Sequence, residues 1–329
     1  MCQAGYEPLL ARELAAAGKD VSASGPGWVL AAGSMEGEFA FPHLRLEAPV
    51  EVEGGAVNAI AQGLWEFFSE SLRGERIETP WPCVFGAAGE EPGLGRRVGS
   101  VGAAFRAILE KKLGRLAKLS SDDLPRGVGP ARGLFVWFTD FGSALVSREA
   151  WRNGQRRMAD DPLAPSRSYL KVEEAYGLLG SEPRAGEAVC DLGAAPGGWS
   201  YSAAKRGARV VAVDNGALKG GALGHAGIEH RRKDAFEIRP SEGLVYDWLF
   251  CDLVEEPHHV LRSIVEPWIR HKGCRRFVVN LKFGRVDPIE LLGELRDAGS
   301  PLRTLAAGVR VRHLYHDRDE FTLTGEVAA

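Results

Sequence analysis

The sequence contains few cysteines, and those it has lie far apart: Cys2, Cys83, Cys190, Cys251 and Cys274. Their number is odd, no two of them form a C-x-x-C pair, and no histidine lies at metal-ligand spacing from them. The pattern therefore argues against a disulfide framework and against a structural zinc site. We expect no bound metal ion and a reducing, cytoplasmic environment.

Long apolar runs are also missing. Every window of 18 residues contains a charge, and the amino-terminal stretch is interrupted by Glu7, Arg12 and Glu13. A transmembrane helix and a signal peptide are therefore not expected, and neither is a membrane partner.

The length and composition are those of a globular protein. The chain has 329 residues, of which 45% are hydrophobic and 26% charged, which predicts about two domains. The net charge of -3 conceals two opposed blocks. Residues 1–95 hold 5 Lys and Arg against 14 Asp and Glu, whereas residues 96–157 hold 13 against 5.

The first half of the chain alternates short helical and strand-like patterns, which is typical of an α+β unit. A polar, proline-containing stretch at 151–168 is interpreted as a linker, so we predict domains at 1–160 and 161–329. The predicted helices lie near 8–17, 56–72 and 101–119, and the predicted strands near 28–32, 134–139 and 143–147.

The second half has apolar, β-rich runs separated by helical stretches. Buried strands that alternate with helices predict a doubly wound parallel sheet, and the last two strands fit an antiparallel hairpin. The predicted strands lie at 187–192, 209–213, 246–251, 276–281, 309–314 and 320–324, and the helices at 199–206, 258–271 and 288–298.

A glycine-rich turn, DLGAAPGGWS (191–200), follows a strand and opens a helix. Its spacing is neither G-x-G-x-x-G nor that of a phosphate loop, and Pro196 removes one backbone N–H. This argues against a pyrophosphate ligand. Asp214 follows Asp191 by 23 residues, near the offset at which an acidic side chain meets ribose hydroxyls.

These residues, with Asp234 in KDA and Asp252 in LFCDLVEEP, resemble the S-adenosylmethionine site of FtsJ-type ribose 2′-O-methyltransferases. The motifs PSRSYLKVEEA (165–175), NLKF (280–283) and LYHDRDEFTL (314–323) resemble those of the RlmM group, which methylates a cytidine ribose in 23S ribosomal RNA. The first half is similar, more loosely, to the THUMP-containing half of that group.

The resemblance implies a fold and a set of site residues. The fold is a Rossmann-like methyltransferase domain with an antiparallel last strand, preceded by a THUMP-like α+β domain that binds RNA. The implied cofactor is S-adenosyl-L-methionine, contacted by Ser168, Ala195, Pro196, Gly197, Gly198, Asp214, Asp234 and Asp252. The implied catalytic tetrad is Lys171, Asp252, Lys282 and Glu320.

Ribose methylation needs a base, because a ribose hydroxyl is a poor nucleophile at neutral pH. We predict that Lys282 accepts the proton and that its pKa is lowered from about 10.4 by burial or by cationic neighbours such as Lys171 and the sulfonium. Asp252 and Glu320 oppose that shift, so their expected task is to orient the two ammonium groups.

Two other methylation chemistries fit less well. Adenine amino-group enzymes typically carry [DN]-P-P-[FYW] where this chain has CDLVEE. Methylation of pyrimidine carbon 5 requires a cysteine nucleophile, but Cys251 precedes Asp252 on a strand and faces the opposite side. We interpret Cys251 as a core residue.

The basic block is the feature that favours RNA as the partner, although a solvated helix face is an open alternative for residues 106–118. A methyltransferase acting on another RNA or on protein stays open, as does a noncatalytic RNA-binding assembly factor. The presence of all four tetrad residues argues against the noncatalytic factor. The block comprises Arg96, Arg97, Arg106, Lys111, Lys112, Arg115 and Lys118, with Arg152, Arg156 and Arg157 beside Trp151 in the linker.

Overall fold

The computed structural model describes residues 1–33, 37–89, 91–240 and 244–328. The chain forms two compact units, one of Met1–Met35 with Phe41–Gly154 and the other of Glu36–Ala40 with Gln155–Ala329. The chain changes unit at 154/155, directly after a strand that ends at Asn153. This position lies a few residues before the boundary near 160 that we predicted.

The first unit is built on an antiparallel-rich sheet with the order β3-β8-β7-β5-β6, in which β4 also pairs with β8. A separate hairpin, β1-β2, accompanies helix α1. This is an α+β arrangement, while its THUMP-like character stays a prediction. The elements are α1 (Glu7–Ala16), β1 (Val21–Gly25), β2 (Trp28–Ala31), β3 (Leu44–Glu47), β4 (Val50–Glu53), α2 (Val57–Ser71), β5 (Trp81–Ala87), α3 (Leu94–Leu119), β6 (Ser120–Ser121), β7 (Val128–Phe138) and β8 (Ser143–Asn153).

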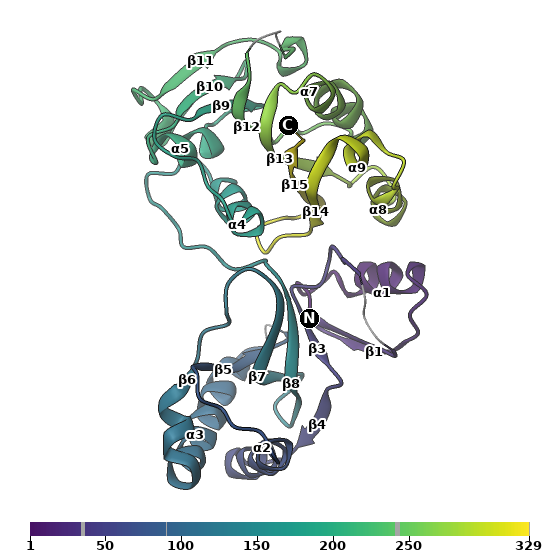
Figure 1. Cartoon of the computed structure of the whole chain (residues 1–329), viewed down its shortest axis with the longest axis vertical. Helices are drawn as coiled ribbons and strands as arrows, with labels where there is room; N and C mark the ends of the chain where they lie inside the picture. Colours follow the sequence, from purple (N-terminus) through teal and green to yellow (C-terminus); the bar gives the residue numbers. More distant parts are fainter. Residues whose placement is uncertain (34–36, 90, 241–243, 329) are drawn as a thin grey trace. The chain divides into compact units, whose positions relative to one another are not determined.

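Helices α2 and α3 pack beside one another against this sheet (Figure 1). Apolar residues at helical spacing explain the packing: Ile60, Leu64 and Phe68 of α2 are fully buried and share a core with Phe105 of α3. Phe68 also stacks on Trp81, with ring centroids 5.2 Å apart. Burial of side chains of this size contributes about 1.5–3 kcal/mol each.

The second unit has a seven-stranded sheet with the order β11-β10-β9-β12-β13-β15-β14. The five strands from β11 to β13 are parallel, and β15 runs antiparallel to both β13 and β14, which confirms the predicted doubly wound sheet with an antiparallel last strand. The elements are α4 (Tyr169–Leu179), β9 (Ala188–Leu192), α5 (Gly198–Ala204), β10 (Arg209–Val213), η1 (Gly220–Ala222), β11 (Ile228–Arg231), η2 (Ala235–Glu237), β12 (Tyr246–Cys251), α6 (Pro257–Val260), η3 (Leu261–Val265), α7 (Glu266–Arg270), β13 (Cys274–Lys282), α8 (Pro288–Arg296), α9 (Pro301–Leu305), β14 (Ala306–Arg312) and β15 (Glu320–Val327).

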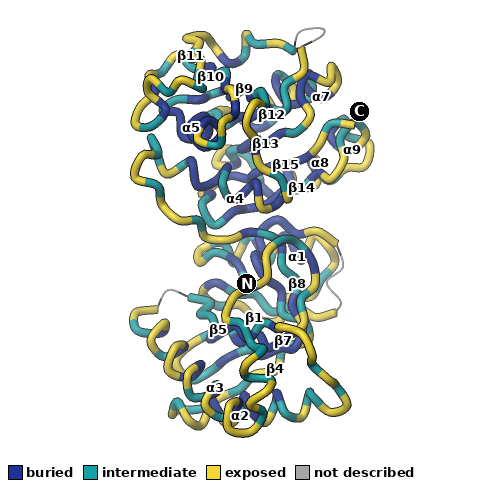
Figure 2. The backbone as a smooth tube through the Cα atoms, turned by 60° about the vertical axis from the view of Figure 1, so that its left-hand side comes forward, coloured by how far each residue is buried: buried dark blue, intermediate teal, exposed yellow. Residues whose placement is uncertain are grey.

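Helices cover both faces of this sheet. Figure 1 shows α4 and α5 on one side of the strands and α7, α8 and α9 on the other. The central strands are therefore buried on both faces, as Figure 2 shows, and Trp248–Cys251 of β12 is completely inaccessible to solvent. This burial explains their continuous apolar sequences. All five cysteines are buried and free.

Several elements differ from the prediction: strands β1, β3, β4 and β5 were not predicted, and the second unit holds two further differences. Strand β11 was missed because its four residues, IEHR, alternate between partly buried and exposed and carry no apolar run. The helix predicted over 258–271 is divided into α6, a π-helical turn (η3) and α7. Pro267 lies just after the π turn, and a proline removes one backbone donor from a helix.

A short segment from the first part of the chain completes the second unit. The carbonyl of Ala40 accepts a hydrogen bond from the His313 N–H at 3.0 Å. Glu38 pairs with the buried guanidinium of Arg312, with an N–O distance of 3.3 Å. The second unit is therefore not one continuous stretch of sequence.

Among the helices that the structure describes, none combines the length and the apolarity needed to cross a membrane. In the same described part of the chain, no three His, Cys, Asp or Glu side chains gather as metal ligands would.

Candidate active site

The glycine-rich turn lies between β9 and α5, at the carboxyl-terminal edge of the parallel strands. The N–H groups of Gly193 and Ala194 both donate to the Val213 carbonyl, at 3.0 and 3.2 Å, which ties the turn to the end of β10. Gly193 has a φ of 78°, and a Cβ atom there would lie 2.6 Å from the Leu253 side chain. The turn therefore requires glycine at this position.

The remaining residues of the turn lead into the helix. Ala195 and Pro196 are joined by a cis peptide bond, and the Pro196 carbonyl accepts from the Lys219 N–H at 2.9 Å. Gly197 has a φ of 106°, and a Cβ on it would lie 2.5 Å from that of Ala222. Gly198 begins α5. The backbone can thus approach a ligand closely in this region.

Asp214 follows β10 and holds the turn in place. Its carboxylate accepts from the N–H groups of Ala195, at 3.0 Å, and Gly216, at 2.7 Å. A carboxylate can accept about four hydrogen bonds, so two are left for ligand hydroxyls. The predicted ribose contact of Asp214 stays a prediction, and the structure adds a second task that the sequence did not suggest.

Ser168 and Asp234 differ in their relation to the turn. The Ser168 carbonyl accepts from the Trp199 indole at 2.9 Å, and a Cβ on Gly198 would lie 3.1 Å from the Ser168 hydroxyl, so this residue lies against the turn. Asp234 is exposed, and its carboxylate caps η2 by accepting from the Phe236 N–H at 2.9 Å. In the described part of the chain, no hydrogen bond joins Asp234 to the turn.

The chemistry of this edge suits a cation better than an anion. Asp191 is the second-to-last residue of β9, and Asp214 and Asp252 directly follow β10 and β12, so three carboxyl groups lie near the turn. Asp191 accepts from the Ser200 hydroxyl at 2.6 Å, and burial, partly opposed by that hydrogen bond, raises its pKa to about 7. These residues fit a positively charged ligand with hydroxyl groups, as S-adenosylmethionine is, and they disfavour a pyrophosphate.

The four residues of the predicted tetrad meet at the same edge. Lys171 comes from the first turn of α4, Asp252 follows β12, and Lys282 and Glu320 are direct cross-strand neighbours on β13 and β15. Lys282 donates to Asp252 Oδ1 at 2.8 Å and also to Glu320. Lys171 donates to Glu320 and lies 3.9 Å from Asp252 Oδ2. The two positive and two negative charges of the tetrad therefore cancel.

Burial and pairing set the charges of the tetrad. The side chains of Lys171, Lys282, Asp252 and Glu320 are 11%, 23%, 16% and 5% exposed. Burial alone would raise the pKa values of Asp252 and Glu320, but the two lysines outweigh burial and hold both pKa values below their usual range. Both carboxylates are therefore ionised.

The expected direction of the Lys282 shift is wrong for this state of the protein. Burial alone would lower the pKa of Lys282, but Asp252 and Glu320 outweigh it and raise that pKa above its ordinary value. The prediction gave weight to Lys171 as a cationic neighbour, whereas the two carboxylates bind the Lys282 ammonium directly. Lys282 therefore carries a proton before ligands bind.

Three polar residues behind the tetrad were not predicted as site residues. Asn280 donates to Asp252 Oδ1 at 3.2 Å, and Thr322, its cross-strand partner, lies 2.6 Å from Asn280 Oδ1. Asp317 lies beneath Thr322 in the turn between β14 and β15 and is 2% exposed. For Asn280 and Thr322, the available signal was a polar residue inside an otherwise apolar strand.

Cys251 is fully buried, and burial raises the pKa of its thiol, so its interpretation as a core residue is confirmed.

The basic block divides into internal and exposed cations. Arg97 donates to three backbone carbonyls, and Arg106 pairs with Asp122 at 2.5 Å. Arg152 donates to backbone carbonyls of the β7-β8 region, which makes it a structural residue. The exposed cations of α3 are Arg96, Lys111, Lys112, Arg115 and Lys118, of which the last four lie at helical spacing.

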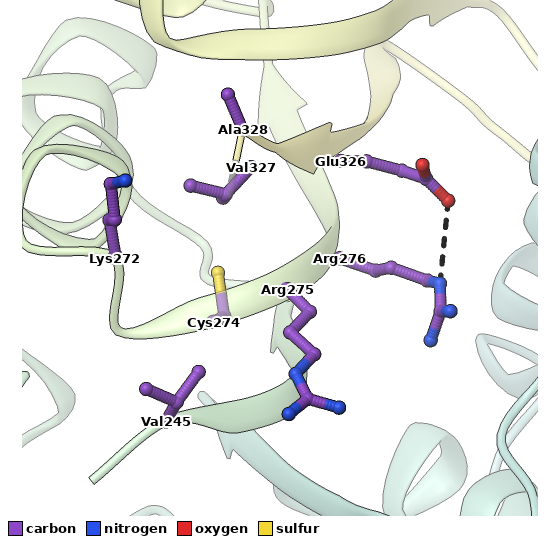
Figure 3. A pocket seen from close by; sticks show the side chains of 8 residues that line it. All are labelled: Val245, Lys272, Cys274, Arg275, Arg276, Glu326, Val327 and Ala328. Atoms are coloured by element: carbon purple, nitrogen blue, oxygen red, sulfur yellow. Dashed lines mark hydrogen bonds and ion pairs between the residues drawn. The ribbon is translucent and has the colours of Figure 1, made fainter. Parts of the chain in front are cut away.

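A cavity of about 380 Å³ lies at the opposite end of β13, where Cys274 begins the strand (Figure 3). Its arginines have acidic partners: Arg276 pairs with Glu326 at 3.4 Å and Arg275 with Asp247 at 3.0 Å. It is thus separate from the tetrad, which gathers where β13 ends at Lys282.

Comparisons with known proteins agree with this geometry. Residues 164–269 match the family model of the FtsJ-like methyltransferase, which confirms the predicted type of the second domain. The chain is 34% identical to the ribosomal RNA large subunit methyltransferase M of Halorhodospira halophila, over 98% of this chain and 94% of that one.

Two further relatives carry the same description. The protein of Xanthomonas oryzae pv. oryzae is 31% identical over 98% of this chain and 96% of its own length. That of Laribacter hongkongensis is 35% identical over 70% of this chain and 66% of its own length. The chain therefore belongs to the ribosomal RNA large subunit methyltransferase M family.

Proposed function

We propose that the chain transfers a methyl group from S-adenosylmethionine to a ribose 2′-hydroxyl of ribosomal RNA, at a cytidine of the 23S molecule. The observation that carries this proposal is the tetrad: a lysine held between two carboxylates, beside a glycine-rich turn surrounded by acidic groups. The names of the relatives support ribosomal RNA as the substrate.

The bound donor would supply an electrophilic methyl group, and the residues that fit it are Ser168, the 195–198 turn, Asp214 and Asp252. The side chains of the tetrad supply proton transfer and orientation. Asp252 and Glu320 fix the position of the Lys282 ammonium through direct hydrogen bonds. Pre-oriented groups of this kind avoid an entropic cost during the reaction.

Lys282 is the proposed acceptor of the 2′-hydroxyl proton. Because its pKa is raised before ligands bind, it must first release the proton that it holds. Further burial and added positive charge both lower the pKa of a lysine, so occupation of the site acts in the required direction. Lys171 shares Glu320 with Lys282 and is proposed to keep that carboxylate charged.

The proposed RNA contacts lie on the exposed cations of α3. Lys111, Arg115 and Lys118 point to solvent and are suited to phosphate contacts. A THUMP-like role of the first unit in positioning RNA rests on these residues. Arg156 and Arg157, which are exposed in the polar stretch before α4, are proposed as further phosphate contacts.

A methyl-transfer assay tests the proposal. The full chain is incubated with labelled S-adenosylmethionine and unmodified 23S ribosomal RNA, and the labelled nucleotide is mapped as a 2′-O-methyl ribose. Lys282→Met should lower kcat by at least ~100-fold, because general-base catalysis contributes that much, while donor affinity is retained. Labelling of a base or of protein would refute the proposed reaction.

A further inference from the structure

A buried chain of polar groups runs behind Asp252. Asn280 Nδ2 lies 3.2 Å from Asp252 Oδ1, and Thr322 Oγ1 lies 2.6 Å from Asn280 Oδ1. Thr322 Oγ1 is also 3.0 and 3.2 Å from the two carboxyl oxygens of Asp317. Asp317 Oδ2 accepts from the Leu314 N–H at 2.9 Å. Asn280 and Thr322 are fully buried, so solvent does not complete these contacts.

The orientation of Asn280 is fixed by the tetrad. Asp252 is ionised, because Lys171 and Lys282 both lie beside it, and an ionised carboxylate only accepts hydrogen bonds. Asn280 must therefore turn its NH₂ group to Asp252. Its carbonyl oxygen is then the atom that faces Thr322.

Counting hydrogens assigns the remaining bonds. The Asn280 carbonyl has no hydrogen to give, so the Thr322 hydroxyl must donate to it. A hydroxyl has one hydrogen and thus cannot also donate to Asp317. The contact between Thr322 and Asp317 is a hydrogen bond only if Asp317 is the donor, which requires a protonated carboxyl group.

The surroundings of Asp317 favour the protonated form. Burial, reinforced by the charge of Glu320 on β15 and opposed by Lys171 on α4, raises the pKa of Asp317 to about 8. Glu174, also on α4, is a second buried carboxyl group whose pKa interacts with that of Asp317. The electrostatic surroundings of Asp317 and the number of hydrogens available to Thr322 therefore indicate the same protonation state.

We propose that Asp317 is a neutral carboxylic acid and the positioning residue at the start of a one-way hydrogen-bond chain. The chain runs from Asp317 through Thr322 and Asn280 to Asp252, and so fixes the carboxylate that holds Lys282. This inference rests on the proposed methyl transfer. Loss of the proton from Asp317 would leave Thr322 with two acceptors and one hydrogen, and the chain would lose its direction.

Infrared spectroscopy of the full chain tests the protonation without any RNA. The wild type at pH 7 should show the carbonyl stretch of a protonated carboxylic acid that Asp317→Asn lacks, whatever other buried carboxyl groups contribute. Identical carboxylic acid bands in the two proteins would show that Asp317 is ionised and would overturn the proposal. This arm gives an answer even if the proposed function fails.

Methyl transfer as a function of pH tests the positioning. Asp317→Asn still donates to Thr322 and accepts from Leu314, so its kcat at pH 7 should stay within about twofold of the wild type. Its kcat should also decline less than that of the wild type above about pH 8, the value to which burial and Glu320 raise the pKa of Asp317. Thr322→Val, which breaks the chain, should lower kcat roughly tenfold without changing the KM for RNA.

A matched control is available on the same strand. Thr324 is as buried as Thr322, and its hydroxyl has no hydrogen-bond partner among the described residues, so Thr324→Val should keep the wild-type kcat and pH profile. Full activity of Thr322→Val, or a wild-type alkaline decline in Asp317→Asn, would overturn the positioning role.

Discussion

The balance of charges in the tetrad predicts how its variants unfold. Lys282→Met leaves Asp252 and Glu320 facing Lys171 alone, with one negative charge in excess. At the observed 2.8 Å, the attraction between Lys282 and Asp252 is about 6 kcal/mol at an effective dielectric constant of 20, and desolvation of the two ions offsets most of it. Removing one partner leaves a buried charge uncompensated, so we expect a loss of about 3–5 kcal/mol in the free energy of unfolding.

The double variant Lys282→Met/Asp252→Asn restores the balance. It leaves one cation, Lys171, and one anion, Glu320, which are in direct contact. Its loss of stability should therefore be smaller than the sum of the two single losses, by about 1–3 kcal/mol. Lys233→Met, at an exposed lysine of the same unit, controls for the loss of a lysine and should change stability by less than about 0.5 kcal/mol.

The assay is urea unfolding of the full chain without donor, and hydrogen exchange of the β13 amides assigns the transition to the second unit. Losses that add within about 0.5 kcal/mol would show that the two groups do not compensate one another. That result would refute charge compensation within the tetrad.

Three other outcomes follow from the site. Asp214→Ala should weaken donor binding at least ~10-fold, because it removes the proposed ribose contact and the hydrogen bonds that hold the glycine-rich turn; calorimetric titration measures this, and unchanged affinity contradicts it. Reversing Lys111, Arg115 and Lys118 to Glu should weaken RNA binding and flatten its dependence on salt by about 0.7–0.9 for each phosphate that the protein no longer neutralises, whereas an unchanged slope would assign them to solvation. Asp317→Asn should change the pH dependence of stability. The raised folded-state pKa contributes stability below pH ~4 that is lost at up to about 1.4 kcal/mol per pH unit as the pH rises to 8. The variant lacks this loss, so its melting temperature relative to the wild type should increase from pH 5 to pH 8, and a parallel pair of profiles would contradict the assignment.

Much of the second unit could be predicted because its strands and its glycine-rich turn leave local patterns in the sequence. Strands such as β12 and β13 are buried on both faces, and continuous apolar runs record that burial directly. The glycine-rich turn was predictable for a similar reason, since positive φ values and close approaches leave few alternatives to glycine. By contrast, β11 is too short and too exposed to leave a pattern.

The tetrad could be proposed from sequence only through the resemblance to a family. Lys171, Asp252, Lys282 and Glu320 lie far apart in the chain, and each alone looks like a solvated charge. Their shared burial comes from the order of the strands, because β15 enters between β13 and β14 and places Glu320 opposite Lys282.

The sign of the Lys282 shift depends on distances that the sequence does not contain. Two carboxylates in direct contact outweigh both burial and a neighbouring lysine. The hydrogen-bond chain from Asp317 to Asp252 could likewise not be predicted from the sequence, because it depends on the register that pairs Asn280 with Thr322. Sequence patterns report which residues are buried, but they do not report which polar atoms meet.

The contribution of Glu38 and Ala40 to the second unit restricts how this protein can be divided. A fragment cut at residue 155 or 161 would contain every member of the tetrad, yet it would lack the Glu38 carboxylate that pairs with Arg312 and the Ala40 carbonyl that accepts from the His313 N–H. The second unit is thus a discontinuous domain. We expect a fragment of it to be stable only when residues 37–40 are added in trans or grafted onto its amino terminus. Replacement of the first unit by that of a relative would therefore need three junctions in the chain, one on each side of the 36–40 segment and one at 154/155.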